Sequence, residues 1–204
     1  MNFMTSLYFV KKDWIPTHVT PFYADTQAIK YSLYNRIKIY KTWGGSMENL
    51  YIRRFNNADA PTISKLICRN FLEVNIKDYS REEMEHLSET YTPDKVMDIS
   101  ESAHMYAACL DDTVVGCGAI SSFWGKQDES ILLTIFVLPE LHGKGIGRKI
   151  IETLERDEYF LRAKRIEIPA SITAYEFYKK MGYDYKDGIK KLTDEGHYRL
   201  EKFK

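Results

Sequence analysis

A glycine-rich turn at residues 142–147, His-Gly-Lys-Gly-Ile-Gly, has the residue types of a phosphate-binding site. It follows an expected apolar strand at residues 131–138 and precedes an expected helix, whose apolar residues recur close to 3.6-residue spacing: Ile146, Ile150, Ile151 and Leu154. The first amides of a helix have no partner inside it, glycine lets an anion approach the backbone, and the helix dipole favours negative charge. Three cations lie in or beside the turn: Lys144, Arg148 and Lys149. The segment therefore predicts a cradle for phosphate or pyrophosphate.

The spacing of the glycines separates three phosphate-binding motifs. A P-loop needs Gly-Lys-Ser/Thr, but here Lys144 lies between two glycines and no Ser or Thr follows. A dinucleotide fingerprint needs a third glycine where the chain has Arg148. The turn instead resembles the pyrophosphate-binding loop of the GCN5-related N-acetyltransferase (GNAT) superfamily. That resemblance covers Phe136-Val137-x-Pro139 and then Gly143-Lys144-Gly145-Ile146-Gly147-Arg148, with His142 where the family usually has Gln or Arg.

A second segment, residues 171–183, resembles the other GNAT signature, Asn-x-x-Ala-x-x-Phe-Tyr-x-Lys-x-Gly-Phe. The matching residues are Ala174, Phe177, Tyr178, Lys180 and Gly182, and Tyr183 replaces the final Phe. Ser171 stands where the family has the Asn that usually bonds the pantetheine arm. The segment Ser-Ile-Thr-Ala at residues 171–174 is also similar to the corresponding segment of the bacterial YafP-like branch.

The resemblance implies an α/β fold with a central mixed, mostly antiparallel, twisted sheet flanked by helices. It also implies acetyl-CoA as cosubstrate, with the pantetheine in an open seam beside the strand before Pro139, and Tyr178 as the general acid that protonates the leaving thiolate. The implied cofactor-binding residues are Ile135, Phe136, Val137, His142, Gly143, Lys144, Gly145, Ile146, Gly147, Arg148, Ser171, Ala174, Phe177 and Lys180.

The general base is left open by the sequence. Glu129, entering the central strand, is the first candidate because family members often place a carboxylate there. His104 is the second, because an imidazole with a pKa near ~6.5 suits the task without tuning. A water relay would need neither residue.

The element order supports the same topology. Strands are expected at residues 50–54, 106–110, 114–123, 131–138, 165–168, 183–186 and 197–203. Helices are expected from about Asn57 or Asp59 to Val74, and at residues 81–91, 146–154 and 171–181, with a short helical turn at 94–99. In the family, residues 71–99 would cover the acceptor site. The acids there are interpreted as a solvated helix face: Glu73, Asp78, Glu82, Glu83, Glu85 and Glu89.

Composition bounds the class of protein. The chain has 204 residues with 29 basic and 29 acidic side chains, so its net charge gives no general attraction to nucleic acid or anionic membranes. Three cysteines without CxxC spacing predict reduced thiols in a cytoplasmic protein, with no metal site. No apolar run approaches the ~20 residues needed to cross a bilayer. We expect a soluble monomer or homodimer.

Residues 1–46 differ from the rest of the chain. They hold six basic, two acidic and ten aromatic residues, and they precede the domain expected at residues 47–204. Three interpretations are open: a weakly packed or disordered extension, a nucleic-acid-binding arm, or a start codon assigned too far upstream, with translation of the native protein starting at Met47. Nucleic-acid binding is the less favoured of the first two.

Together these features predict an acyltransferase that moves an acetyl group from acetyl-CoA to a primary amine of an unidentified acceptor. Attack would be direct, within a ternary complex, because no residue is placed like a covalent nucleophile. The alternative is an acyl-CoA-binding regulatory or sensory module without turnover.

Overall fold

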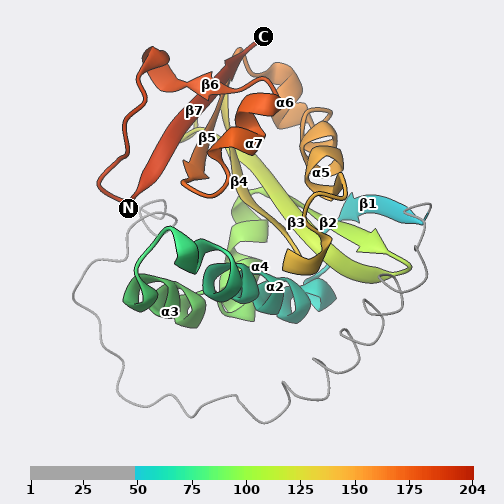
Figure 1. Ribbon diagram of the computed structural model, residues 1–204. Helices are drawn as coiled ribbons and strands as arrows, with labels where there is room; N and C mark the ends of the chain where they lie inside the picture. Colours follow the sequence, from blue (N-terminus) through green and yellow to red (C-terminus); the bar gives the residue numbers. More distant parts are fainter. Residues whose placement is uncertain (1–48) are drawn as a thin grey trace, which may run out of the picture. The chain divides into compact units, whose positions relative to one another are not determined.

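The computed structural model describes residues 49–204, which form one seven-stranded sheet with helices on both faces (Figure 1). The strands are β1 (Leu50–Arg54), β2 (His104–Leu110), β3 (Thr113–Ser122), β4 (Glu129–Val137), β5 (Arg165–Ser171), β6 (Asp184–Tyr185) and β7 (His197–Phe203). Their order in the sheet is β1-β2-β3-β4-β5-β7-β6. Within the described chain, β4 and β5 run parallel and the other neighbouring pairs are antiparallel. The predicted fold class is confirmed.

The helices are α2 (Ala60–Glu73), α3 (Arg81–Thr90), α4 (Pro93–Ser102), α5 (Ile146–Leu154), α6 (Glu158–Arg162) and α7 (Tyr175–Lys180). In the described part of the chain, none is long and apolar enough to cross a membrane. The expectations for residues 1–46 lie outside the described residues.

Local capping explains where the sequence prediction of helix boundaries was wrong. The side chain of Asn56, not Asn57 or Asp59, caps the turn that leads into α2, by accepting a hydrogen bond from the amide of Ala58. The Asp59 carboxylate instead bonds the Asn56 amide at 2.8 Å and the Arg53 guanidinium at 2.7 Å. Thr92 caps α4, which is a full helix of ten residues and not a short turn.

Two glycines of β3 determine how closely α5 packs on the sheet. A Cβ at Gly118 would lie 2.5 Å from Ile150 of α5, and one at Gly116 would lie 3.1 Å from the same side chain. On the opposite face, Phe136, the β4 partner of Cys117, packs edge-on against Phe71 of α2 with ring centroids 5.6 Å apart. Alternation along β3 therefore assigns α5 to one face of the sheet and α2 to the other.

The connector between α2 and α3 is fastened to the far half of the sheet by Tyr79. Its hydroxyl donates to the carbonyl of Gly196 at 2.8 Å and accepts from the amide of Ile172 at 2.9 Å. Beside it, the Thr173 hydroxyl donates to Asp78 at 2.7 Å. One phenol thus joins the helical cover to the β5–α7 turn and to the turn before β7.

Tyr79→Phe should lower the free energy of unfolding by about 1–3 kcal/mol, because the Ile172 amide and the Gly196 carbonyl both lose their partner. Urea denaturation would measure the loss. Tyr198→Phe is the matched control, since the Tyr198 hydroxyl makes no hydrogen bond within the described chain, and it should change stability by less than about 0.5 kcal/mol. Equal losses of stability in the two variants would contradict the role of the Tyr79 hydroxyl in joining the connector to the sheet.

Candidate active site

The strands β4 and β5 pair over a short stretch and then separate. Three residue pairs join them, from Glu129 opposite Arg165 to Ile131 opposite Glu167. Beyond Ile131, the edge of β4 that faces β5 has no strand partner, and residues 133–137 are half-buried. This is the seam that the family resemblance implies, and it leaves strand-edge N–H and C=O groups available to an extended ligand.

A β-bulge at Thr134 shapes the middle of the seam. The register between β3 and β4 shifts between Cys117 and Ala119, and Thr134 adopts a φ of 53°. The thiol of Cys117 lies 3.3 Å from the Thr134 carbonyl oxygen, and burial raises the pKa of that thiol to about 12. A bulge changes the direction in which backbone groups point next to a site. The residue types of β4 did not predict this bulge.

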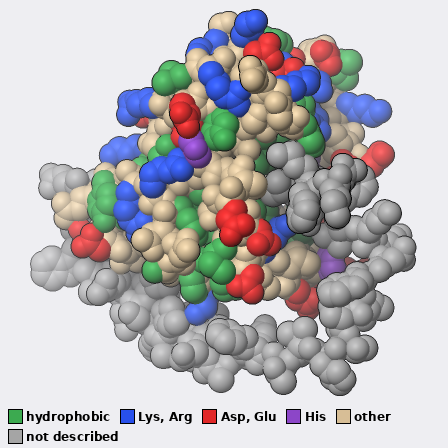
Figure 2. All heavy atoms as spheres, turned by 180° about the vertical axis from the view of Figure 1, so that it is seen from behind, with side chains coloured by type: hydrophobic (Ala, Val, Ile, Leu, Met, Phe, Trp, Pro, Cys, Tyr) green, Lys and Arg blue, Asp and Glu red, His purple; other side chains and the backbone are tan. Residues whose placement is uncertain are grey.

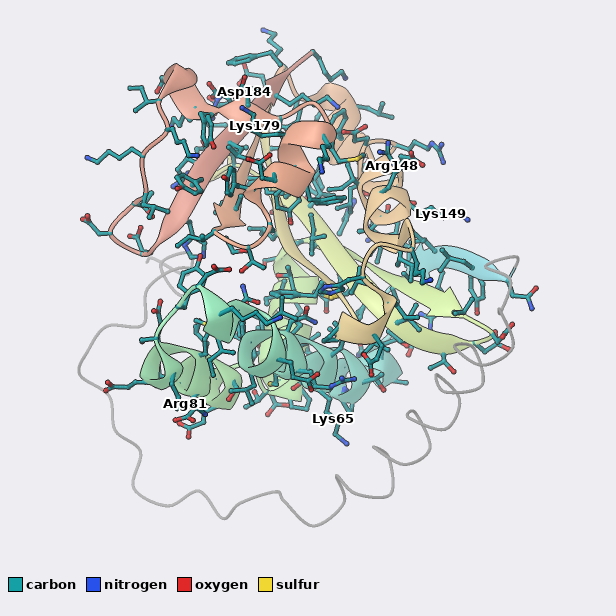
Figure 3. All side chains as sticks on the ribbon, in the orientation of Figure 1. Lys65, Arg81, Arg148, Lys149, Lys179 and Asp184 are labelled. Carbon is teal, nitrogen blue, oxygen red and sulfur yellow. The ribbon has the colours of Figure 1, made fainter. Side chains whose placement is uncertain are left out.

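The glycine-rich turn forms an open anion cradle at the start of α5. Gly143 and Gly145 have φ of 75° and 83°, a region that disfavours other residues, and a Cβ at either would meet nothing within 4 Å. The amides of residues 145–148 make no hydrogen bond to the described backbone. Arg148 and Lys149 project outward from α5 (Figure 3). Shape, unpaired amides and charge therefore fit a pyrophosphate.

His142 bonds the protein itself. Its Nε2 donates to the carbonyl of Val137 at 2.9 Å, and Asn70 Nδ2 from α2 donates to the same oxygen at 3.0 Å. This carbonyl ends β4, so the two donors fix the point where the strand turns into the cradle. The imidazole positions the turn in the place where the family usually has Gln or Arg.

The two signature segments meet at Gly147. A Cβ there would lie 3.2 Å from the Phe177 ring, so the bare glycine lets α7 pack against the first turn of α5. Ala174 begins α7 as its N-cap, and its carbonyl accepts from the Phe177 amide at 3.0 Å. Ser171 ends β5 opposite His197. Lys180 is exposed at the far end of α7 and does not reach this junction.

Tyr178 lies beside this junction with its side chain buried. Its ring packs edge-on against Phe177 at 5.1 Å. Burial raises the pKa of its phenol, and the nearby Cys117 adds to the effect. Within the described residues the hydroxyl has no hydrogen-bond partner, so its proton is retained through neutral pH and is free for a ligand.

The two bases considered from the sequence lie elsewhere. Glu129 is at the paired end of β4, where its carboxylate bonds Lys126 at 2.6 Å and Arg165 at 2.7 Å. His104 Nδ1 lies 2.8 Å from Asp157, the residue that caps α6. Neither side chain reaches the open part of the seam, and this placement argues against both as the base.

An aromatic wall closes the seam on the α2 side. Phe71 contacts Phe136 and also Tyr91, whose ring centroid is 5.3 Å away. Burial raises the pKa of Tyr91, while a hydrogen bond to Thr134 opposes this effect. Tyr91 lies at the end of α3, directly before Thr92-Pro93, and no sequence motif marks it as a site residue. It supplies an apolar face beside the bulge.

The surface of the described chain carries both acidic and basic side chains. Figure 2 shows acidic and basic side chains interspersed on the face seen from behind. Among residues 49–204, no group of three or more His, Cys, Asp or Glu side chains is placed to hold a metal ion.

Comparisons with known proteins agree with this geometry. A model of the acetyltransferase (GNAT) family matches residues 67–183, and it distinguishes no branch within the superfamily. PaiA N-acetyltransferase from Thermoplasma acidophilum, solved with coenzyme A, is 20% identical, with a TM-score of 0.65 over 76% of this chain and 99% of its own. A GCN5-related N-acetyltransferase from Rhodopseudomonas palustris is also 20% identical, with a TM-score of 0.64 over 78% of this chain and 98% of its own. No curated protein sequence matches the chain significantly.

Glu129→Gln tests whether Glu129 is an ion-pair partner. Hydrogen bonds from Lys126 and Arg165 lower the pKa of Glu129 against the opposing effect of burial. The ionised carboxylate therefore stabilises the fold above the ordinary Glu pKa of about 4.3, and this contribution is lost as the pH falls through the lowered value. In urea denaturation the variant should be less stable by up to about 1 kcal/mol at neutral pH, and the difference should vanish in acid.

Glu152→Gln on α5 is the control for this measurement, since no ion pair holds Glu152 within the described chain. A Glu129→Gln difference that did not change with pH would contradict the ion-pair role.

Proposed function

The chain belongs to the acetyltransferase (GNAT) family, and from this we propose that it transfers an acetyl group from acetyl-CoA to a primary amine of an acceptor. The observation that carries the proposal is the contact between Phe177 and Gly147. It joins the start of α5, the proposed anion cradle, to α7, which carries the buried phenol of Tyr178. Acyl transfer from a CoA thioester needs both, together with the open edge of β4 for the pantetheine arm.

The cradle and the seam position the thioester. The unpaired amides of residues 145–148 bind the pyrophosphate, and the free edge of β4 at Ile135 and Val137 bonds the amides of the pantetheine arm as an added strand would. A backbone N–H near the Thr134 bulge polarises the thioester carbonyl. Holding the thioester beside the acceptor removes much of the entropic cost of a bimolecular reaction.

Proton transfers complete the reaction. The acceptor ammonium loses a proton, and the neutral amine attacks the thioester carbonyl carbon. The C–N bond forms, the C–S bond breaks, and the leaving thiolate takes the proton of Tyr178. The second proton, which the attacking nitrogen loses as the amide forms, returns to the Tyr178 phenolate. Burial keeps this phenol protonated at neutral pH, and a thiolate formed in the same desolvated place is a strong enough base to accept its proton.

Gly145→Asp places a carboxylate in the cradle and should weaken acetyl-CoA binding at least about tenfold relative to Gly145→Asn. Asp and Asn have nearly the same shape, and both tolerate the positive φ of Gly145 better than other residues, so the pair isolates the charge. Calorimetric titration with acetyl-CoA would compare them. Equal affinities for the Asp and Asn variants would show that the diphosphate binds elsewhere.

A screen of small amines, peptides and aminoglycosides for thiol release from acetyl-CoA tests the reaction, and Tyr178→Phe tests the acid. The variant should turn over about 10²-fold more slowly with unchanged acetyl-CoA affinity, because the thiolate loses its proton donor. Tyr183→Phe is the matched control in the same signature and should keep the rate.

Acetyl-CoA binding without thiol release for any amine would favour the alternative, an acyl-CoA-binding module without turnover. Full activity of Tyr178→Phe would assign the proton to another donor.

A further inference from the structure

His197, the first residue of β7, lies on the sheet face that α2 and its connector cover. It pairs with Ser171, at the end of β5 where the seam is open. Its ring lies beside Tyr79 of the connector, with centroids 6.5 Å apart. Since adjacent strands are about 4.8 Å apart, one strand spacing separates its backbone from Ser171.

Its ring nitrogens are unengaged. Within the described residues neither nitrogen of His197 has a hydrogen-bond partner, and the side chain is half-buried. The other described histidines differ: His104 bonds Asp157, His142 bonds the Val137 carbonyl, and His86 is exposed on α3.

The carboxylates on the same face are already neutralised. Glu129 and Glu201 both bond Arg165, each at 2.7 Å. Glu167, fully buried, is paired with Arg165 and Arg199. A carboxylate held by a guanidinium is a poor proton acceptor, because the cation stabilises its ionised form.

Burial favours a neutral His197 ring against the charge of a nearby carboxylate. Burial lowers the pKa of His197, and Glu195 in the preceding turn opposes this effect. The connector contributes Tyr79 and Asp78, and Asp78 is bonded to Thr173. Arg199, two residues along β7, pairs with Glu167, and β5 contributes the uncharged Pro169 and Ser171.

We propose that His197 is the general base of the proposed acetyl transfer and takes the proton of the acceptor ammonium. The proton moves from the ammonium to an unprotonated ring nitrogen, the neutral amine then attacks the thioester carbonyl, and the imidazolium later releases the proton to solvent. Tyr178 supplies a separate proton to the thiolate, so the acid and the base are different residues. This inference rests on the proposed function.

The test is the pH profile of kcat/KM for an amine found by the thiol-release screen, over about pH 5.5–9.5. In the unsubstituted protein kcat/KM should fall on the acid side as His197 is protonated. His197→Asn should be about 10²-fold slower near neutral pH and should recover toward the amine pKa of about 10, where the acceptor is itself neutral. Acetyl-CoA affinity should not change, and His104→Asn is the matched control that should keep the profile.

The possible results distinguish failure of His197 as the base from failure of the proposed acetyl transfer. If His197→Asn reacts at neutral pH within about twofold of the unsubstituted protein, His197 is not the base, and the proposed acetyl transfer is unaffected. No thiol release by the unsubstituted protein would overturn both. If His197→Asn does not bind acetyl-CoA, His197→Gln replaces it, and failure of both to bind would show that the ring is structural and overturn the proposal.

Discussion

The separation of β4 from β5 after Ile131 and Glu167 is the constraint on which the site depends. A strand that leaves its neighbour exposes a row of N–H and C=O groups, and inside a protein such groups need partners. The chain fills one of these positions itself, because Asn70 and His142 both donate to the Val137 carbonyl. The rest of the edge is left for a ligand that can bond like a strand. The proposed binding of the pantetheine arm would thus be a consequence of where the pairing of β4 with β5 ends.

The contact between Phe177 and Gly147 couples the two halves of the site. Because no Cβ separates them, α7 sits against the first turn of α5, and the phenol of Tyr178 is held in a buried position next to it. Gly147, which the sequence predicts to let a phosphate approach the backbone, therefore also has a packing role. A change at this position would disturb the proposed acid as well as the proposed cradle, so cofactor binding and proton transfer would not be independent.

The fold was predictable where the signal is periodic or has a fixed spacing. The helix after the cradle was predicted because four apolar residues recur on one face, and all four are buried. The five-residue α6 was missed because it is too short to show a period and begins at the Asp157 cap. The Thr134 bulge was missed because it arises from a register shift between strands. The sequence also could not show that Glu129 faces Arg165, a residue 36 positions away that joins it only through the parallel pairing of β4 and β5.

Arg165 explains why the proposed acid–base chemistry is assigned to a phenol and an imidazole and not to a carboxylate. One guanidinium contacts Glu129, Glu167 and Glu201, which come from three neighbouring strands, so the charges of the sheet are balanced within the sheet. Beside the seam, the rings of Phe71, Tyr91 and Phe136 pack against one another and form an apolar surface. In a poorly solvated place of this kind a neutral amine is favoured over an ammonium, since desolvation penalises the charged form. The burial that keeps Tyr178 protonated would therefore also lower the cost of deprotonating the proposed amine nucleophile.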